Sequence, residues 1–311
     1  MTAVSCHAKQ SGNYLGLPDL GFGVGLREVH FDYLLRHEHG VDWFEVISEN
    51  YIDNNGYSRY VLDQLREQTP LVMHGVSLSI GSTDPLNLQY LRELKQLASE
   101  LQPVWLSDHL CWTGVQGRNS HDLLPLPLTD ESFRHVSQRI LQVQDLLERP
   151  LILENPSSYL QWAASDWHEA DFLNQLANET GCGLLLDLNN VYVSCFNHQL
   201  DAGDYLQRLD LSHVVQLHLA GPVVHNGLLI DTHNQPVPDQ VWQLYRSFCQ
   251  RRTDCALLLE WDADIPPYPQ MLLELDKARQ VQQGLMPVAQ PLAASSVAVS
   301  TPVAFHLGQM L

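Results

Sequence analysis

The segment Gln216–His233, QLHLAGPVVHNGLLIDTH, contains two short apolar runs that each end in residues able to bind a metal. The first run ends at His218, and the second ends at Asp231 and His233. Residues two apart in an extended segment face the same side, so Asp231 and His233 are expected to point into one site. A carboxylate and two imidazoles in one segment indicate a ligand set for zinc, iron or manganese. The ordinary alternative is one solvated acid and two hydrogen-bonding histidines.

The same pattern, an apolar run followed by polar residues, recurs along most of the chain. Apolar runs that indicate strands lie at residues 21–27, 43–47, 70–73, 104–106, 151–153, 183–186, 214–217 and 256–259. Amphipathic runs that indicate helices lie between them, at residues 30–37, 60–68, 88–101, 132–147, 170–179, 205–209 and 241–251. Such alternation is typical of a parallel sheet whose strands are covered by helices. About eight strand–helix units favour a closed (β/α)8 TIM barrel over an open sheet.

Length and composition indicate a compact globular protein. The 311 residues are 45% hydrophobic and only 17% charged, which suits a large buried core. We expect a single TIM-barrel domain over residues 1–283. Residues 284–311, in which Ala, Val, Pro and Ser predominate, are expected to form a flexible tail.

Charge and cysteine content limit the classes of partner and compartment. The formal net charge of −19 disfavours nucleic acid and suits cations or a positively charged peptide or protein. Six scattered cysteines without a CxxC motif are typical of the reducing cytoplasm. The sequence has neither a recognisable signal peptide nor an apolar run of membrane-spanning length, so we expect a soluble cytoplasmic protein without membrane association.

Polar residues at the ends of the predicted strands point to a metal site. The active site of a TIM barrel lies at the carboxyl ends of its strands. Here those positions hold Glu49, His74, His109, Glu154, Asp187, Asn190, His218, Asp231, His233 and Glu260. Ordinary turn and capping residues would be Ser, Thr, Asn, Asp and Gly, not four histidines and several glutamates.

The number and type of these side chains indicate more than one metal. One divalent ion needs about four to six ligands, so this set suits about two or three ions, with Glu154 placed to bridge two of them. Histidine and carboxylate ligands without a thiolate favour iron, manganese or zinc.

Seven phrases of the sequence, in their order along the chain, resemble those of a known enzyme family. They are ISENY (47–51), MHGVSLSIG (73–81), LSDHL (106–110), LENPSSY (153–159), LLLDLNNVYVS (184–194), QLHLAG (216–221) and LIDTHN (229–234). The family is that of the multinuclear non-heme iron-dependent oxidative (MNIO) enzymes, which includes a methanobactin-biosynthesis oxidase. The resemblance covers roughly residues 18–280 and implies a barrel similar to those of xylose isomerase and endonuclease IV.

The resemblance also implies how the ligands divide among the metals, by correspondence with the three-metal arrangement of the endonuclease. One metal would be held by His74, His109 and Glu154. A second would be held by Glu154, Asp187, His218 and Glu260. A third would be held by Asp231, His233 and, where the endonuclease has a histidine, Asn190.

The activity implied by the resemblance is oxidation of cysteine residues in a ribosomally synthesised precursor peptide. It would use two or three iron ions, with a mixed-valent Fe(II)/Fe(III) pair, and dioxygen as co-substrate. Asp187 and His218 would serve the chemistry as ligands, and Glu49 as a base or a substrate contact. A separate protein that binds the leader of the precursor is also implied. Candidates for peptide contacts are the loops at residues 51–58 and 113–126, the second with Asn119, His121 and Asp122.

Three other functions would fit the same barrel and ligand types. A sugar isomerase or epimerase would need a catalytic lysine, or a His–Asp pair on the substrate hydroxyl, and no lysine stands at a predicted strand end. A phosphodiesterase would need a basic rim, which the net charge of −19 disfavours. A non-catalytic, metal-loaded scaffold that binds a peptide or protein would differ from an enzyme only in its lack of turnover.

Overall fold

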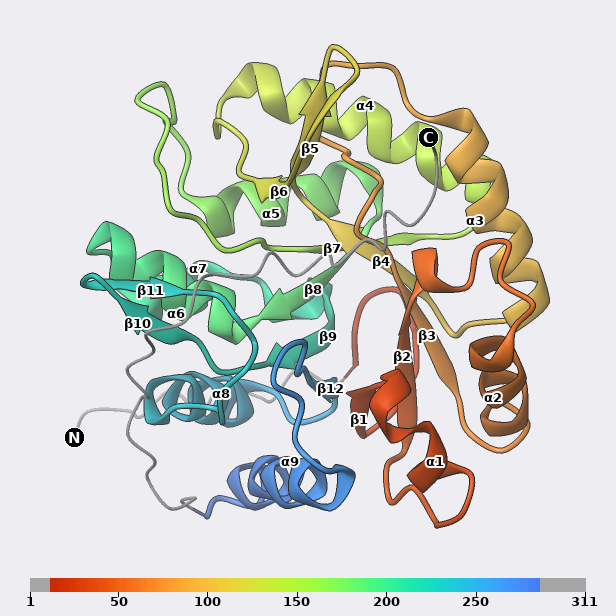
Figure 1. Ribbon diagram of the computed structural model, residues 1–311. Helices are drawn as coiled ribbons and strands as arrows, with labels where there is room; N and C mark the ends of the chain where they lie inside the picture. The colour runs from red at the N-terminus through yellow and green to blue at the C-terminus, as the bar shows by residue number, and fades with distance from the viewer. Residues whose placement is uncertain (1–11, 286–311) are drawn as a thin grey trace.

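Eight parallel strands close into a barrel in the computed structural model, which describes residues 12–285 (Figure 1). In order around the barrel they are β1 (Phe22–Gly25), β2 (Trp43–Ile47), β3 (Leu71–His74), β4 (Leu106–His109), β7 (Leu151–Glu154), β8 (Gly183–Asp187), β9 (Val214–Leu219) and β12 (Ala256–Leu259). Strand β1 pairs with both β2 and β12, which closes the sheet. The predicted (β/α)8 barrel is therefore confirmed. The predicted tail over residues 284–311 lies outside the described residues except for its first two.

Helices surround the strands, as Figure 1 shows. They are α1 (Phe31–Leu34), α2 (Tyr57–Leu65), α3 (Leu88–Leu101), α4 (Asp130–Leu147), α5 (Glu169–Thr180), α6 (Leu188–His198), α7 (Ala202–Arg208), α8 (Asp239–Arg251) and α9 (Tyr268–Gln282), with short 3-10 helices at Glu28–His30, Ser48–Asn50 and Leu211–His213. Several begin at a polar cap; the Asn87 side chain, for example, accepts hydrogen bonds from the backbone of Gln89 and Tyr90 at the start of α3. None of the helices within residues 12–285 is both long and apolar enough to cross a membrane.

The prediction of a loop over residues 113–126 was wrong. Strands β5 (Trp112–Val115) and β6 (Arg118–Leu124) pair antiparallel there and form a hairpin. Gln116 and Gly117 at its tip both have positive φ, 54° and 70°, as a tight hairpin turn with the twist of the strands requires. Both Asp84 carboxylate oxygens accept hydrogen bonds from the backbone of these two residues, which holds the turn against the loop that follows β3.

The second apolar run of the opening segment also forms a hairpin and is not a strand of the barrel. Strand β10 (Val223–His225) pairs antiparallel with β11 (Leu228–Ile230) across an Asn226–Gly227 turn. Asp231 and His233 follow this hairpin, but His233 has a φ of 46° and is not extended. The two side chains do meet, as expected. The predicted reason, alternation along an extended strand, was wrong.

The inside of the barrel is built in layers. Its lower part is a buried apolar cluster formed by Trp43, Val72, Trp105, Ile152, Leu185, Val215, Ala256 and Leu258, and its lower end is covered by Leu15, Leu17 and Leu20. Alternate residues of a strand face the same side. Five of the cluster residues are therefore followed, two positions later on the same strand or just past its end, by a charged or imidazole side chain that faces the same interior. These five side chains are Glu45, His74, Glu154, Asp187 and Glu260. The apolar core thus supports a layer of acids and histidines directly above it.

Strand β9 joins this pattern through a β-bulge. Leu184 is paired with Val214, but Leu185 is paired with Gln216, so that Val215 is an extra residue in β9. Val215 belongs to the apolar cluster, whereas Gln216 bonds to side chains inside the barrel above it. His218 then faces the same side as Gln216. A bulge of this kind re-aims the side chains that follow it, here towards the layer of acids.

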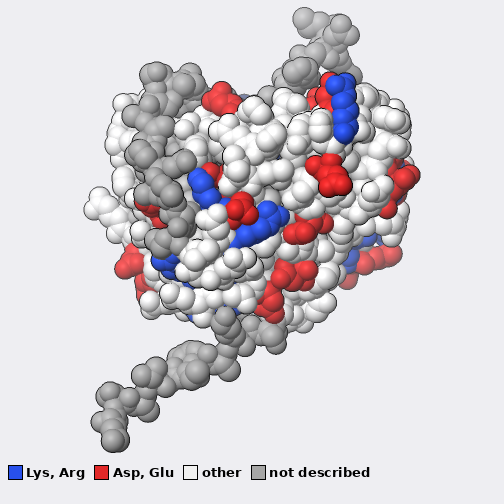
Figure 2. Space-filling model, turned by 90° about the horizontal axis from the view of Figure 1, so that it is seen from below, with Lys and Arg blue, Asp and Glu red and all other residues white. Residues whose placement is uncertain are grey.

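The protein surface is acidic, with 36 Asp and Glu residues against 17 Lys and Arg. Figure 2 shows one face, on which acidic side chains are spread out and basic side chains are fewer. Such a surface suits a partner or substrate that carries positive charge.

Candidate metal centre

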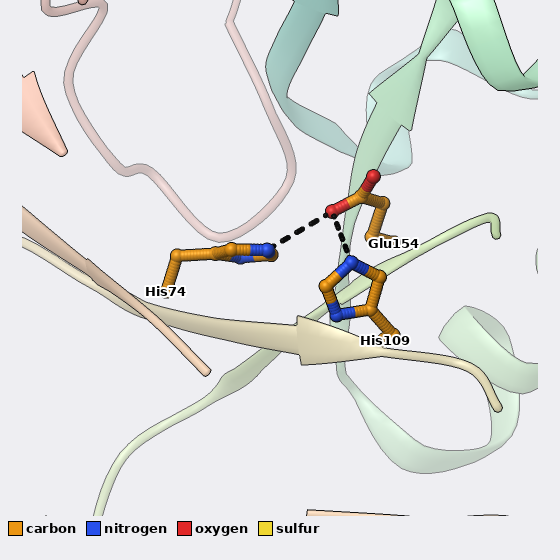
Figure 3. Close-up of side chains that lie close together, drawn as sticks. All are labelled: His74, His109 and Glu154. Atoms are coloured by element: carbon orange, nitrogen blue, oxygen red, sulfur yellow. Dashed lines mark ion pairs between the residues drawn. The ribbon is translucent and has the colours of Figure 1, made fainter. Parts of the chain in front are cut away.

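Two histidines and one glutamate meet at the carboxyl ends of β3, β4 and β7. The Nε2 atoms of His74 and His109 each lie 3.3 Å from Glu154 Oε2 (Figure 3). His109 Nδ1 faces the carbonyl oxygen of Gly75 at 3.1 Å, and His74 Nδ1 faces Ser107 Oγ at 2.8 Å. The carbonyl can only accept, and the Ser107 hydroxyl donates its own hydrogen to a backbone carbonyl. Both rings therefore carry their hydrogen on Nδ1 and turn a lone pair on Nε2 towards Glu154.

A second group lies around His218 Nδ1. Glu260 Oε2 is 3.0 Å from this nitrogen, Asp187 Oδ2 is 3.9 Å away, and Glu154 Oε1 is 4.0 Å away. Glu154 thus directs one carboxylate oxygen to each of the two groups. Asp187 Oδ1 is used differently, because it accepts a hydrogen bond from the backbone N–H of Asn190 and caps helix α6. Only Asp187 Oδ2 therefore faces the second group.

A third group forms at His233. Its Nε2 is 2.6 Å from Asp231 Oδ1, and its Nδ1 is 3.2 Å from both Glu260 Oε2 and Asp262 Oδ2. Asn189 Nδ2 donates to Asp231 Oδ1 at 2.6 Å. Ligand atoms of His233, Asp187 and Glu260 also lie within 4.8 Å of one another, so this group adjoins the second.

Asn190 lies against the second group, through its contact with Glu154. Its Nδ2 donates to Glu154 Oε1 at 3.2 Å and to the carbonyl oxygen of Asn155 at 3.0 Å. Its Oδ1 is buried and accepts no hydrogen bond from the described residues. The Asn190 amide therefore has a free carbonyl oxygen, while its nitrogen contacts Glu154.

Glu49 stands apart from these groups. Its Oε1 accepts hydrogen bonds from the Tyr90 hydroxyl at 2.7 Å and from the backbone N–H of Val76 at 2.9 Å. Its Oε2 is buried without a hydrogen-bond partner among the described residues. Glu49 is thus held in one orientation with one oxygen free. It also affects a neighbour, because burial and the nearby Glu49 carboxylate raise the pKa of Asp108 well above its usual range.

The charges in this centre favour a cation among the ligands. Burial, which disfavours the ionised form, raises the pKa of Glu154 well above its usual range and that of Asp187 to about 7, and repulsion from neighbouring carboxylates adds to both shifts. Glu154 Oε2, Asp187 Oδ2 and Asn190 Oδ1 are buried acceptors to which no described residue donates a hydrogen bond. Positive charge placed among such lone pairs stabilises them. The donor set, imidazole nitrogen with carboxylate and amide oxygen, fits iron, manganese or zinc.

The pKa values of His218 and His109 are shifted in opposite directions. Burial alone would lower the pKa of His218, but the Glu45 and Glu260 carboxylates raise it well above its usual value. In contrast, burial lowers the pKa of His109 well below its usual value, so that its ring is neutral and suited to bind a metal.

Sequence reasoning missed several side chains that contact the predicted ligands. They are Glu45, Asn189, Gln216 and Asp262. For Glu45 a signal was present, since it is a charged residue at an inward position of the otherwise apolar strand WFEVI. Gln216 gave the same kind of signal, as a polar residue in the apolar strand VVQLHL. For Asn189 and Asp262 no signal was available, because their contacts depend on the loops after β11 and β12.

The predicted peptide contacts lie on the β5–β6 hairpin. Asn119, His121 and Asp122 are exposed on β6, and Asn119 Oδ1 accepts a hydrogen bond from the backbone of His121. The hairpin leans on the loop after β7, since Trp162 Nε1 donates to the carbonyl oxygen of Pro125 at 2.9 Å. The hairpin and the loop after β7 are therefore connected by a hydrogen bond on this side of the barrel. Contact of these residues with a peptide stays a prediction.

Two solved structures with the same fold are similar to this chain along nearly its whole length. Endonuclease IV from Thermus thermophilus has a TM-score of 0.54 and 17% identity, covering 85% of this chain and 98% of that one. A 3-keto-D-glucoside 4-epimerase from E. coli has a TM-score of 0.54 and 15% identity, covering 84% and 99%. At these identities the similarity shows the fold alone, a xylose isomerase-like TIM barrel.

Relatives with much higher identity share most of the chain. A UPF0276 protein of Caulobacter vibrioides is 51% identical over 260 residues, covering 83% of this chain and 93% of the relative. A UPF0276 protein of an Anaeromyxobacter species is 47% identical over 271 residues, covering 87% and 96%. A family model described as "RiPP precursor modification enzyme MbnB/TglH/ChrH" matches residues 21–283, where RiPP denotes a ribosomally synthesised and post-translationally modified peptide. The chain therefore belongs to this family of RiPP precursor modification enzymes, the MNIO enzymes.

Proposed function

We propose that this protein is a multinuclear iron- and dioxygen-dependent oxidase that modifies cysteine residues of a ribosomally synthesised precursor peptide. The observation that carries the proposal is the position of Glu154, whose two oxygens face two separate groups of ligands in a member of a peptide-modifying family. A carboxylate in that position could serve as a ligand for two metals, which would then act on one substrate group. A separate leader-binding protein is part of the proposal.

The chain would hold the metals through three sets of residues. The first set is His74, His109 and Glu154. The second is Glu154, Asp187, His218 and Glu260. The third is Asp231 and His233, with Glu260 beside them. Asn190, which the resemblance assigns to this third set, lies instead against Glu154 of the second set. Bound iron would supply one-electron redox chemistry and binding positions for a thiolate and dioxygen.

The protein side chains would orient the substrate and accept a proton. Glu49 Oε2 is free while its Oε1 is fixed by Tyr90 and Val76, so Glu49 is suited to take a proton from the peptide or to hold its backbone. The acidic surface favours approach of a basic peptide or partner. The β5–β6 hairpin and the loop at residues 51–58 would bind the peptide chain.

The proposal is tested by the metal content and Mössbauer spectrum of protein purified without oxygen from iron-supplied cells. Two or three irons per chain, including a coupled mixed-valent pair, are expected. Zinc or manganese alone, with no recoverable iron, would contradict the proposal and favour an isomerase or a hydrolase. Substrate class is tested by mass spectrometry of a cysteine-containing precursor peptide incubated with the enzyme and its partner. A mass change that persists after the peptide cysteines are replaced with serine would exclude cysteine modification.

Replacing Asp187 or His218 with Ala is expected to abolish both iron coupling and turnover. Each variant removes a ligand atom that faces the second group, so the metal adjacent to the Glu154 bridge would be lost. Mössbauer spectra and peptide mass spectra provide the two measurements. Asp171→Ala, which breaks a surface ion pair with Arg208, is the control and should leave both unchanged. Full activity in Asp187→Ala or His218→Ala would contradict the proposal that the second group binds a metal required for turnover.

A further inference from the structure

Strand β1 has a glycine at the level where neighbouring strands have charged side chains. Gly23 faces the inside of the barrel, since a Cβ atom there would clash with the ring of Trp43 in the apolar cluster. Alternate residues of a strand face the same side, so Gly25 faces the inside as well. Gly25 is paired with Glu45 of β2, which belongs to the layer of acids and histidines. Strand β1 itself therefore adds no side chain to this layer.

The guanidinium group of Arg27 fills the place above this glycine. A Cβ atom on Gly25 would lie only 2.6 Å from Arg27 Nη1 and 2.8 Å from Arg27 Cζ. Arg27 Nη2 is 2.5 Å from Asp262 Oδ1 and 4.0 Å from Glu260 Oε1. Within residues 12–285, Arg27 is the only lysine or arginine that forms an ion pair with a predicted metal ligand. It thus brings a permanent positive charge to the layer of ligands.

One nitrogen of this guanidinium has no acceptor in the described part of the chain. Nη1 is buried and donates a hydrogen bond to none of residues 12–285, and the Arg27 side chain as a whole is only 12% exposed. A buried charged donor without an acceptor is costly, and arginine cannot lose its proton to reduce this cost. Nη1 is therefore suited to bind an oxygen atom of a molecule that enters the metal centre.

The surrounding charges favour one kind of oxygen atom. The carboxylates of Asp262, Glu260 and Glu45 lie close enough to raise the pKa of Arg27. The same three groups would repel a further anion. A peptide carbonyl oxygen accepts a hydrogen bond from a guanidinium without adding negative charge. The position therefore suits a backbone carbonyl group better than a carboxylate or a phosphate.

We propose that Arg27 binds the peptide substrate, with Nη1 donating a hydrogen bond to a backbone carbonyl oxygen beside the residue that is modified. The inference rests on the proposed function, because it takes a peptide as the substrate. Arg27 would hold the peptide backbone in place so that the side chain of the modified residue reaches the metals. It belongs to none of the three ligand groups.

The test uses metal-free protein loaded with Co²⁺, and two thiols as probes. N-acetylcysteine N-methylamide contains peptide carbonyl groups, whereas ethanethiol contains none. Binding of a thiolate to Co²⁺ changes the visible absorption of the metal, which gives a dissociation constant for each probe. The same spectra give the number of Co²⁺ ions bound, and circular dichroism reports folding.

Replacing Arg27 with Met is expected to weaken binding of the amide probe about 10–100-fold, the range for a hydrogen bond with a charged partner. Methionine fills the space of the side chain but donates no hydrogen bond. Binding of ethanethiol and the number of Co²⁺ ions should not change, because neither depends on a carbonyl group.

A matched control is Arg59→Met. The Arg59 side chain is 16% exposed, close to the value for Arg27, and it pairs with Asp63 and Glu100 between α2 and α3. This position lies on the outside of the barrel, so both probes should bind to Arg59→Met as they bind to the wild-type protein.

A second variant, Gly25→Ala, keeps Arg27 and the net charge but displaces the guanidinium group. The atoms nearest to the added Cβ belong to the end of the flexible Arg27 side chain, so the side chain can move while the backbone stays in place. We expect the same selective loss of affinity for the amide probe. This variant also decides the matter if Arg27→Met fails to fold.

Equal losses for the two thiols, or no loss for either, would overturn the role of Arg27. Loss of Co²⁺ from the variants would also overturn it, since Arg27 would then stabilise the metal centre and not the substrate. If wild-type protein with Co²⁺ binds neither thiol, the proposed function fails, and the role of Arg27 fails with it. If wild-type protein binds both thiols but the variants do not distinguish them, the role of Arg27 alone is wrong.

Discussion

Replacing Glu154 with Gln is expected to weaken metal binding at two ligand groups at once and to abolish turnover. One carboxylate oxygen of Glu154 faces His74 and His109, and the other faces His218. An amide keeps only one oxygen, and its NH2 group cannot bind a cation. The affinity of both ions should fall by more than the about 10–100-fold that loss of an outer partner costs.

The measurement is metal stoichiometry after dialysis against a weak chelator, compared with His109→Gln. That variant removes a ligand of the first group alone, so one ion should be lost and the ion at His218 retained. If Glu154→Gln and His109→Gln lose the same single ion, Glu154 does not bridge. The proposal of two metals that share a carboxylate would then have to be withdrawn.

Replacing Arg252 with Met is expected to lower the free energy of unfolding by about 2–6 kcal/mol, because it leaves two buried carbonyl oxygens, those of Leu211 and Val214, unpaired at about 1–3 kcal/mol each. Arg252 is 1% exposed and lies between α8 and β12, at the end of the barrel opposite the metal centre. Its Nη1 donates to the carbonyl oxygens of Leu211 and Val214 at 2.7 and 2.6 Å, and its Nη2 donates to that of Asp254 at 2.7 Å. Methionine fills the space but donates to none of them.

Urea unfolding followed by tryptophan fluorescence measures this effect, with both proteins prepared at the same metal content. Arg36→Ala is the control, because the Arg36 side chain is 71% exposed and forms a surface pair with Asp32. Its removal should change stability by less than about 1 kcal/mol. A similar loss of unfolding free energy in both variants would show that the hydrogen bonds from Arg252 to buried carbonyl oxygens do not stabilise the fold.

The barrel could be predicted because its strands are short apolar runs, and the eight runs all correspond to barrel strands. Strand ends were harder to place where polar residues continue a strand. In β4, Leu106–His109, only Leu106 is apolar, yet Ser107, Asp108 and His109 are all buried. Asp108 is tolerated there because the backbone N–H groups of Leu78 and His109 donate to it. Such compensation depends on distant segments and leaves no local pattern.

Helix α6 and the two hairpins were missed for other physical reasons. Helix α6 begins directly after Asp187, within a segment interpreted only as a strand end, and includes Asn189 and Asn190, which favour turns over helices. The Asn226–Gly227 pair is a strong hairpin signal, but the residues on its two sides were interpreted only as a Gly-Pro segment and an apolar run. Of the candidate site, the types of residue and their level in the barrel followed from strand ends. Their partners, above all Glu45 behind His218, required the three-dimensional packing.

The extra residue in β9 has a consequence for how this chain tolerates change in length. Below the bulge the strand is in phase with the apolar cluster, and above it the strand is in phase with the metal centre. The face to which each side chain points changes with every residue that is added or removed, so it cannot change gradually. Deleting Val215 would leave the strand apolar enough to pair, yet would rotate His218 with respect to one of the two layers. Loops around the barrel can lengthen or shorten without such a penalty. The number of residues in this strand is therefore fixed by the need to serve both layers, whichever side chain occupies position 215.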